Sequence, residues 1–198
     1  MTNCTRRSFL TSAGAGALTV FARRVHAADY TFTQFHNQTA ASSLHQRLSQ
    51  MWIAIGKETN GRVEARVFPG NNNIPGSDPA ALKMLVNGEI QFFTLMGGIL
   101  GTVVPVAEVQ QVPFMFRTAA HAHRTMDGPL GAYLREEMAA KGIYGFPVGA
   151  FDNGMRQIAS SRRPIAAPAD LAGIRMRVPA GEMVADTFRA FSATRLKG

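Results

Sequence analysis

Two arginines alternate with apolar residues late in the chain, in a stretch that otherwise predicts a buried strand. In residues 174–178, Ile-Arg-Met-Arg-Val, every second side chain is apolar, and Pro179 ends the run. This alternation is typical of a strand with one face in a core. Arg177 stands at the carboxyl end, where a guanidinium is either a solvated strand end or a receptor that meets a carboxylate with two parallel hydrogen bonds. For Arg175, inside the strand, we expect simple solvation.

Further candidate ligand contacts follow the earlier predicted strands. His36, Asn37 and Gln38 come directly after a predicted strand at 29–35, and they supply either ligand hydrogen bonds or ordinary turn chemistry. Met96 and Gly97 end a predicted strand at 89–96, where glycine lets a ligand or a second lobe approach the backbone. In open α/β sheets, ligands bind outside the carboxyl ends of the strands. Residues 36–38 are therefore predicted to face the same crevice as Arg177.

The elements that would position these residues alternate between strand and helix. Strands are predicted at 29–35, 62–68, 89–96, 143–151, 153–161 and 174–178, and helices at 44–59, 78–87, 119–126, 129–142 and from about 181. Asp78 is the expected N-cap of its helix, with Pro79 in the first turn. Alternation of this kind predicts an α/β fold with a mostly parallel sheet. The short crossing at 151–154 is the predicted link between two lobes, and it makes Asn153 a candidate hinge and ligand contact.

The N-terminal segment has the features of an export signal. Arg6-Arg7 precede Ser8-Phe9-Leu10 and a small-residue apolar stretch, and the pattern before a cut after Ala27 suits signal peptidase. The paired arginines resemble the twin-arginine export motif, and an ordinary secretory signal is the alternative. Either signal places the mature protein in the periplasm. The one cysteine, Cys4, lies inside this segment, so no disulfide is expected in the mature chain.

Composition excludes several classes of function. The 198 residues are 46% hydrophobic and 17% charged, as in a soluble globular protein. Without the four signal arginines the chain keeps 17 basic and 13 acidic residues, and these are scattered, which argues against nucleic-acid binding. His121 and His123 stand two apart on a predicted helix and point in different directions, so neither a metal site nor a cofactor is expected. Nothing assembles an acid, a base and a nucleophile; a secreted hydrolase or metalloenzyme is the second class of hypothesis.

Five stretches, in order, resemble the periplasmic solute-binding proteins of TRAP transporters, of the dicarboxylate-binding type. They are residues 56–71, 85–93, 112–131, 153–179 and 184–191. The resemblance implies a two-lobed fold of the periplasmic-binding-protein type, class II-like, that closes on an organic acid and delivers it to the membrane permease subunits. It also implies that Arg177, which matches the family's R-V-P segment, pairs with the ligand carboxylate. Arg156 matches a second arginine of the family, in an N-G-x-R segment.

The resemblance divides the chain into a signal peptide at 1–27, a first lobe at 28–151 and the start of a second lobe at 152–198. After Phe191 the sequence leaves the family pattern, so the second lobe is expected to be incomplete. Such a chain is expected to be marginally stable and to bind weakly or not at all, and a non-functional remnant is an alternative. Which organic acid it takes is not readable from the residues.

Overall fold

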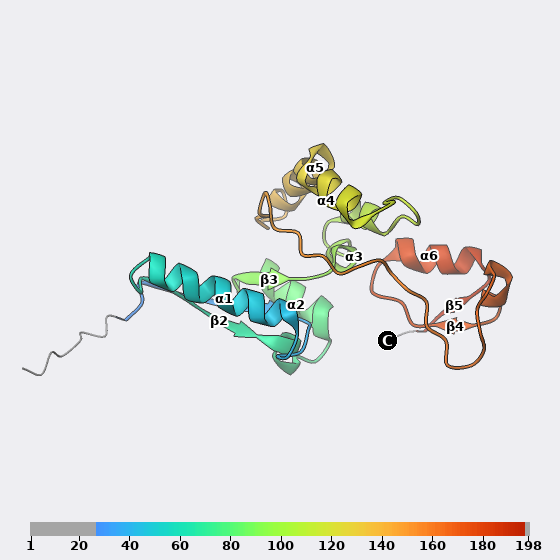
Figure 1. Ribbon diagram of the computed structural model, residues 1–198, viewed down its shortest axis with the longest axis horizontal. Helices are drawn as coiled ribbons and strands as arrows, with labels where there is room; N and C mark the ends of the chain where they lie inside the picture. The colour runs from blue at the N-terminus through green and yellow to red at the C-terminus, as the bar shows by residue number, and fades with distance from the viewer. Residues whose placement is uncertain (1–26, 197–198) are drawn as a thin grey trace, which may run out of the picture.

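The computed structural model describes residues 27–196, so the predicted signal segment lies outside the described residues except for Ala27. A three-stranded parallel sheet is formed by β1 (Tyr30–His36), β2 (Val63–Phe68) and β3 (Phe92–Thr94), in the order β2-β1-β3 (Figure 1). The chain adds β2 on one side of β1 and then crosses to add β3 on the other. The predicted α/β class with parallel strands is confirmed.

Helix α1 (Ser43–Glu58) begins and ends at the signals that the sequence carries. The Ser42 hydroxyl accepts a hydrogen bond from the N–H of His45, as an N-cap does. Asn60 and Gly61 take left-handed backbone conformations, with φ of 53° and 79°. These conformations end the helix and return the chain to β2.

Apolar side chains cover both faces of the first sheet, because successive residues of a strand point to opposite faces. On one face, Trp52 of α1 packs against Phe32 and Phe92, with ring centroids 6.3 and 4.9 Å apart. On the other face lies helix α2 (Ser77–Val86). The buried cluster on that side comprises Phe35, Ala81 and Ile90.

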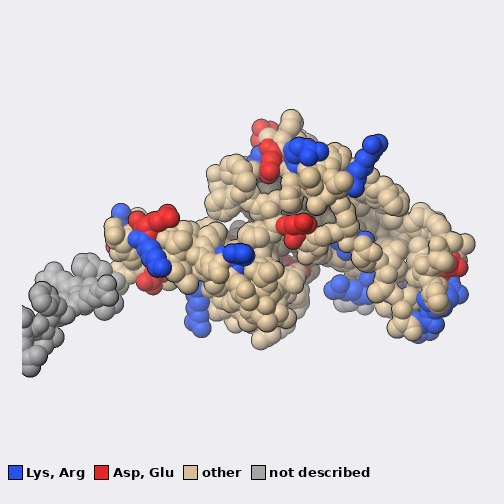
Figure 2. All heavy atoms as spheres, viewed as in Figure 1, with Lys and Arg blue, Asp and Glu red and all other residues tan. Residues whose placement is uncertain are grey.

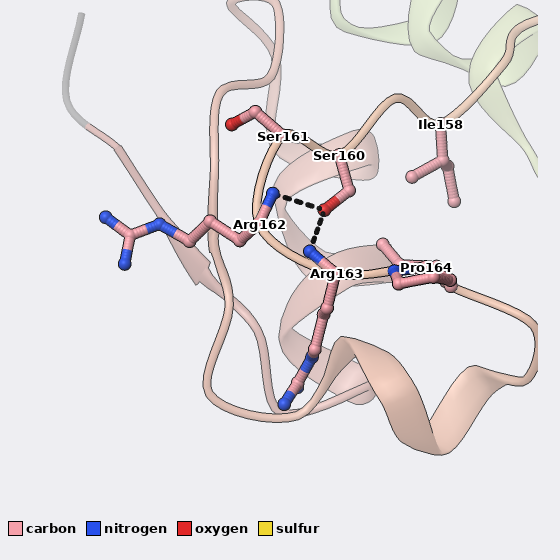
Figure 3. Close-up of a pocket in the computed structure, with 7 residues that line it drawn as sticks. Ile158, Ser160, Ser161, Arg162, Arg163 and Pro164 are labelled. Carbon is pink, nitrogen blue, oxygen red and sulfur yellow. Dashed lines mark hydrogen bonds between the residues drawn. The ribbon is translucent and has the colours of Figure 1, made fainter.

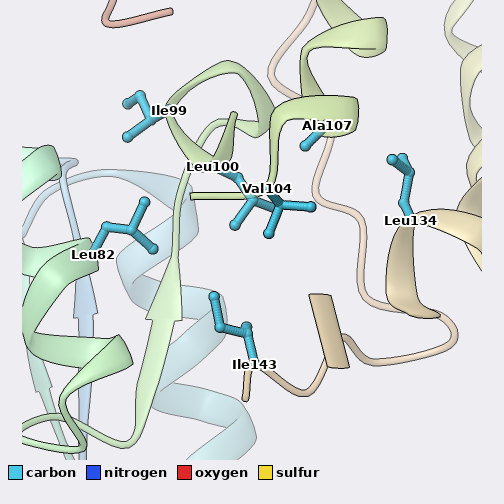
Figure 4. Packing of buried hydrophobic residues seen from close by; sticks show 7 residues of the cluster. All are labelled: Leu82, Ile99, Leu100, Val104, Ala107, Leu134 and Ile143. Atoms are coloured by element: carbon cyan, nitrogen blue, oxygen red, sulfur yellow. The ribbon is translucent and has the colours of Figure 1, made fainter. Parts of the chain in front are cut away.

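The largest core cluster joins this sheet to a layer of helices. That layer contains α3 (Gly97–Leu100), the 3₁₀ segment η2 (Pro105–Gln111), α4 (Ala119–Asp127) and α5 (Pro129–Ala139). The buried members of the cluster are Leu82, Ile99, Leu100, Val104, Ala107, Leu134 and Ile143. Figure 4 shows Leu100 and Val104 between Leu82 of α2 and Leu134 of α5. This cluster therefore joins α2 to α3, η2, α5 and Ile143.

The remaining elements form a second, smaller sheet. They are the 3₁₀ segment η3 (Pro168–Leu171), β4 (Arg175–Met176), α6 (Glu182–Ala190) and β5 (Thr194–Arg195), and β4 pairs in parallel with β5. Below, residues 27–151 are called the first unit and residues 152–196 the second unit. Figure 1 shows α6, β4 and β5 grouped apart from the first sheet. A lobe boundary at residue 151 stays a prediction. No helix between residues 27 and 196 is long and apolar enough to span a membrane.

Two predicted strands are wrong. Residues 143–151 and 153–161 are not in strands, and β3 is shorter than the predicted 89–96. In the first of these segments Tyr144, Phe146 and Val148 are 73%, 57% and 83% exposed. Alternation shows that a segment can present one apolar face, but a strand forms only beside a neighbour that takes its hydrogen bonds. Among residues 27–196 this segment has no strand beside it.

The predicted N-cap of α2 is also wrong. The helix starts at Ser77, after Gly76, and Asp78 lies in its first turn. The Asp78 carboxylate accepts hydrogen bonds from the side-chain amides of Asn37 (2.7 Å) and Asn71 (2.6 Å). Asp78 therefore ties the loop after β1 to the turn after β2, instead of capping its own helix.

Candidate ligand-binding site

The carboxyl ends of β1 and β3 lie side by side at the point where the sheet reverses its strand order. His36, the last residue of β1, stands opposite Thr94, the last residue of β3. The loop that begins at Asn37 and the loop that begins at Leu95 therefore leave the same edge of the sheet. Ligands of open α/β sheets bind at such a point, where the strand order reverses. The structure thus brings two of the predicted groups of site residues to one edge.

The residues of the first loop are engaged in the fold itself. The His36 ring is fully buried, and its Nε2 lies 3.0 Å from Nδ1 of His45. The Asn37 amide donates to Asp78, and Gln38, which is exposed, donates to Asn37 Oδ1 over 3.0 Å. The turn chemistry considered as an alternative is therefore present. A ligand contact by these three residues stays a prediction.

Hydrogen bonding fixes the protonation of the histidine pair. The backbone N–H of Gln38 donates to His36 Nδ1 (3.2 Å), so this nitrogen carries no proton. In the neutral ring the proton is then on Nε2, which donates to His45 Nδ1. Burial lowers the pKa of His36 below its usual 6.5, and the charge of His45 lowers it further.

This geometry predicts a loss of stability on acidification. The unfolded chain takes up the His36 proton at a higher pH than the folded chain, so the stabilisation is complete above pH 6.5 and is lost as the pH falls below it. The slope that one proton can add is at most about 1.4 kcal/mol per pH unit. Urea unfolding between pH 8 and pH 5 measures it. His36→Gln should remove this part of the slope, whereas His123→Gln, at an exposed position on α4, should keep it. An unchanged slope in His36→Gln contradicts the prediction.

The residues after β3 meet the start of the second unit. The side-chain amide of Asn153 lies 3.4 Å from the Met96 sulfur. A Cβ on Gly97 would stand only 2.4 Å from Nε2 of Gln110. A side chain at position 97 would therefore displace the amide group of Gln110, which packs against this glycine. The structure places Asn153 against Met96 and Gln110 against Gly97, and a ligand contact by Met96, Gly97 and Asn153 stays a prediction.

Arg156 also contacts η2, through a residue that the sequence analysis missed. Its guanidinium donates to Oε1 of Gln111 over 2.9 Å, and its side chain is exposed. Gln110, Gln111 and Glu108 all lie in a segment that the sequence describes only as irregular. One signal was available, because Glu108 is the only acidic residue between Glu89 and Asp127.

Arg177 follows β4 directly and is exposed. Among residues 27–196 its guanidinium has no hydrogen-bonding partner. Four residues later, Gly181 lies against α3: a Cβ there would be 3.1 Å from the carbonyl oxygen of Gly98. The N-cap residue of α6 therefore approaches the backbone of α3. The pairing of Arg177 with a ligand stays a prediction.

Two surface hollows are lined by other residues. One, of about 390 Å³, is formed by the turn at residues 158–165 (Figure 3). There the Ser160 hydroxyl accepts from the backbone N–H groups of Arg162 and Arg163, and the Arg163 guanidinium donates to two carbonyls of the same unit. The polar groups of this hollow thus hold its own turn. In the described part of the chain, no three His, Cys, Asp or Glu side chains are placed to hold a metal ion.

Charge is divided unequally between the two parts of the chain. Residues 28–151 contain nine basic and nine acidic side chains, whereas residues 152–198 contain eight basic and four acidic ones. The net charge of +4 that remains after the predicted signal is removed therefore belongs to the second segment. Figure 2 shows basic and acidic side chains interspersed over the first unit and mostly basic ones over the second. This asymmetry favours the approach of an anion.

Residues 35–195 match the family of bacterial extracellular solute-binding proteins, family 7. The chain belongs to this family. The match includes every candidate site residue and confirms the resemblance on which the fold was predicted. Family 7 is a family of binding proteins, not one of enzymes.

Named relatives and solved structures of family 7 agree with this assignment. The Escherichia coli 2,3-diketo-L-gulonate-binding periplasmic protein YiaO is 30% identical over 70% of this chain and 41% of its own length. A TRAP periplasmic solute-binding protein of Xanthobacter autotrophicus, with bound β-D-galacturonate, is 27% identical, with a TM-score of 0.77 over 84% of this chain and 54% of that one. Another, from Sulfurospirillum deleyianum with bound succinate, is 26% identical, with a TM-score of 0.74 over 85% and 53%. The chain spans about half the length of these family 7 proteins.

Proposed function

We propose that this chain captures an organic acid in the periplasm and hands it to the permease of a TRAP transporter. The observation that carries the proposal is the point where the sheet reverses its strand order. There the loops after β1 and β3 leave one edge of the sheet, within a family 7 fold. Arg177 and Arg156 are the proposed contacts for the carboxylate. Export through a twin-arginine signal, and a cut after Ala27, belong to the same proposal.

The proposed ligand class follows from the chemistry of arginine. A guanidinium offers a planar fork of donors that a carboxylate meets with two parallel bonds. The exposed guanidinium of Arg177 and the surplus of basic residues after position 151 both suit an anion. The ligands named for the three relatives (2,3-diketo-L-gulonate, galacturonate and succinate) all carry a carboxylate. The shared carboxylate, rather than any one compound, defines the proposed class.

Isothermal titration of the chain with these three acids tests the proposal, with D-galactose as the uncharged counterpart of D-galacturonate. We expect at least one acid to bind about tenfold or more tightly than galactose, because a charge-assisted hydrogen bond is worth about 1.5–3 kcal/mol. Since weak binding is predicted for this chain, the titrations extend into the millimolar range. Equal or absent heats for all four compounds would overturn the proposal.

A further inference from the structure

Glu108 reaches from the first unit to the start of α6 in the second. Its Oε1 accepts a hydrogen bond from the N–H of Glu182 (3.1 Å), and its Oε2 accepts one from the N–H of Met183 (2.5 Å). Glu182 and Met183 are the first two residues of α6, and they lie 74 and 75 residues after Glu108. One carboxylate thus satisfies two backbone donors of a distant helix.

Helix α6 has no cap of its own. The first N–H groups of a helix lack partners inside it, and a side chain at the N-cap normally supplies one. Here the N-cap is Gly181, which has no side chain, and the carboxylate of Glu182 pairs instead with Arg195 (3.3 Å). The positive end of the helix dipole also favours a carboxylate at this point. Glu108 therefore accepts hydrogen bonds from N–H groups at the start of α6 that the N-cap residue of that helix leaves without a partner.

Small residues make room for this contact. A Cβ on Gly101 would stand 2.2 Å from Cγ of Glu108, and one on Gly181 would stand 3.1 Å from the carbonyl oxygen of Gly98. Gly101 has a helical φ of −54°, so its backbone would accept alanine, and only the Glu108 side chain excludes a larger residue. The Glu108 side chain and the backbone of α3 are fitted to each other.

Few other bonds join the two units. Among residues 27–196, four hydrogen bonds link the first unit to the second, and two of these are made by Glu108. The other two involve Asn153 and Arg156, close to the junction of the units. Between residues 157 and 196, only Glu108 holds the second unit to the first by hydrogen bonds.

We propose that Glu108 is a latch that docks the second unit on the first. While the latch is closed, Gly181 and the start of α6 are held against α3 and η2. When the carboxylate leaves α6, the second unit is free to pivot about the crossing near residues 152–156. The latch needs no bound ligand, so its test is independent of the proposed function.

Electron-spin resonance of two spin labels measures the distance between the units. The labels are attached at Lys83→Cys of α2 and Ala190→Cys of α6, in a chain that also carries Cys4→Ser. We expect one narrow distance distribution with Glu108 present and a broader, longer one in Glu108→Gln. Hydrogen exchange at the amides of Glu182 and Met183 should become about tenfold or more faster, with the amides of β1 unchanged, because opening is local. The matched control is Glu136→Gln, at an exposed position of α5.

Gly101→Ala provides a second test that leaves the charge of Glu108 in place. Its Cβ should push Glu108 away from α6 and reproduce the Glu108→Gln distances, whereas Gly56→Ala in α1, whose Cβ would make an ordinary 3.6 Å contact, should not. Unchanged distances in both Glu108→Gln and Gly101→Ala would overturn the latch. Faster exchange throughout the chain, β1 included, would overturn it as well, because Glu108 would then support the whole fold and not the docking of one unit.

Discussion

Replacing Arg177 by alanine is expected to weaken binding of an organic acid by about 100-fold or more. Two charge-assisted hydrogen bonds, each worth about 1.5–3 kcal/mol, would be lost, and about 1.4 kcal/mol corresponds to a factor of ten. Arg177→Lys keeps the charge but not the planar fork, so its affinity should lie between those of the wild type and of Arg177→Ala. Titration with the acid that binds best to the wild-type chain measures all three.

Arg175→Ala is the matched control for Arg177→Ala. Both arginines are exposed, Arg175 in β4 and Arg177 directly after it, and their removal changes the net charge equally. If the positive net charge simply attracted anions, both variants would lose the same amount of affinity for the acid. We expect Arg175→Ala to stay within about threefold of the wild type, as for an exposed side chain without a ligand contact. Wild-type affinity in Arg177→Ala, or an equal loss in Arg175→Ala, would contradict the assignment.

Elements with local signals were predicted well from the sequence. Helix α1 carries an apolar stripe, a serine N-cap and the Asn60-Gly61 stop, and all of these act within a few residues. The same holds for the end of α2 at Asn87. Such signals depend on backbone conformation and on near neighbours, and the sequence displays both directly.

Features that depend on distant partners were missed or wrong. Asp78 suits an N-cap, yet its carboxylate is taken by Asn37, 41 residues earlier, and by Asn71. Glu108 contacts amides 74 and 75 residues away, and no local pattern marks that pairing. The segment 143–151 has the right alternation for a strand but no neighbouring strand between residues 27 and 196. Periodicity indicates which structure a segment can form. Whether it forms that structure depends on the distant strand or side chain that it contacts.

The candidate site also combines features that local signals predict with features that depend on distant contacts. The sequence placed residues 36–38 and 96–97 after strands, and the parallel sheet brings both groups to one edge. Their neighbours Gln110 and Gln111 come from η2, whose path over the end of β3 depends on tertiary packing. The site edge was therefore predictable, whereas the segment that borders it was not.

Leu82→Ala should cause the largest loss of stability. Leu82 is 1% exposed and belongs to the cluster that joins α2 to α3 and η2. Removing a buried leucine side chain costs about 2–5 kcal/mol, because packing is lost and a cavity remains. A domain is stable by only about 5–15 kcal/mol. Urea unfolding should therefore show a much lower midpoint, or a chain that is already unfolded without urea.

Two variants distinguish packing from other effects in that experiment. Val86→Ala, in the same helix but 43% exposed, should stay within about 0.5 kcal/mol of the wild type. Leu82→Met conserves volume and should cost less than about 1.5 kcal/mol. If Leu82→Ala lowered the free energy of unfolding no more than Val86→Ala does, the cluster would not be the core of the first unit. Because Val104, Ala107 and Ile99 share this cluster, loosening it should also displace η2, and with it Gln111 and Glu108 at the contact with the second unit.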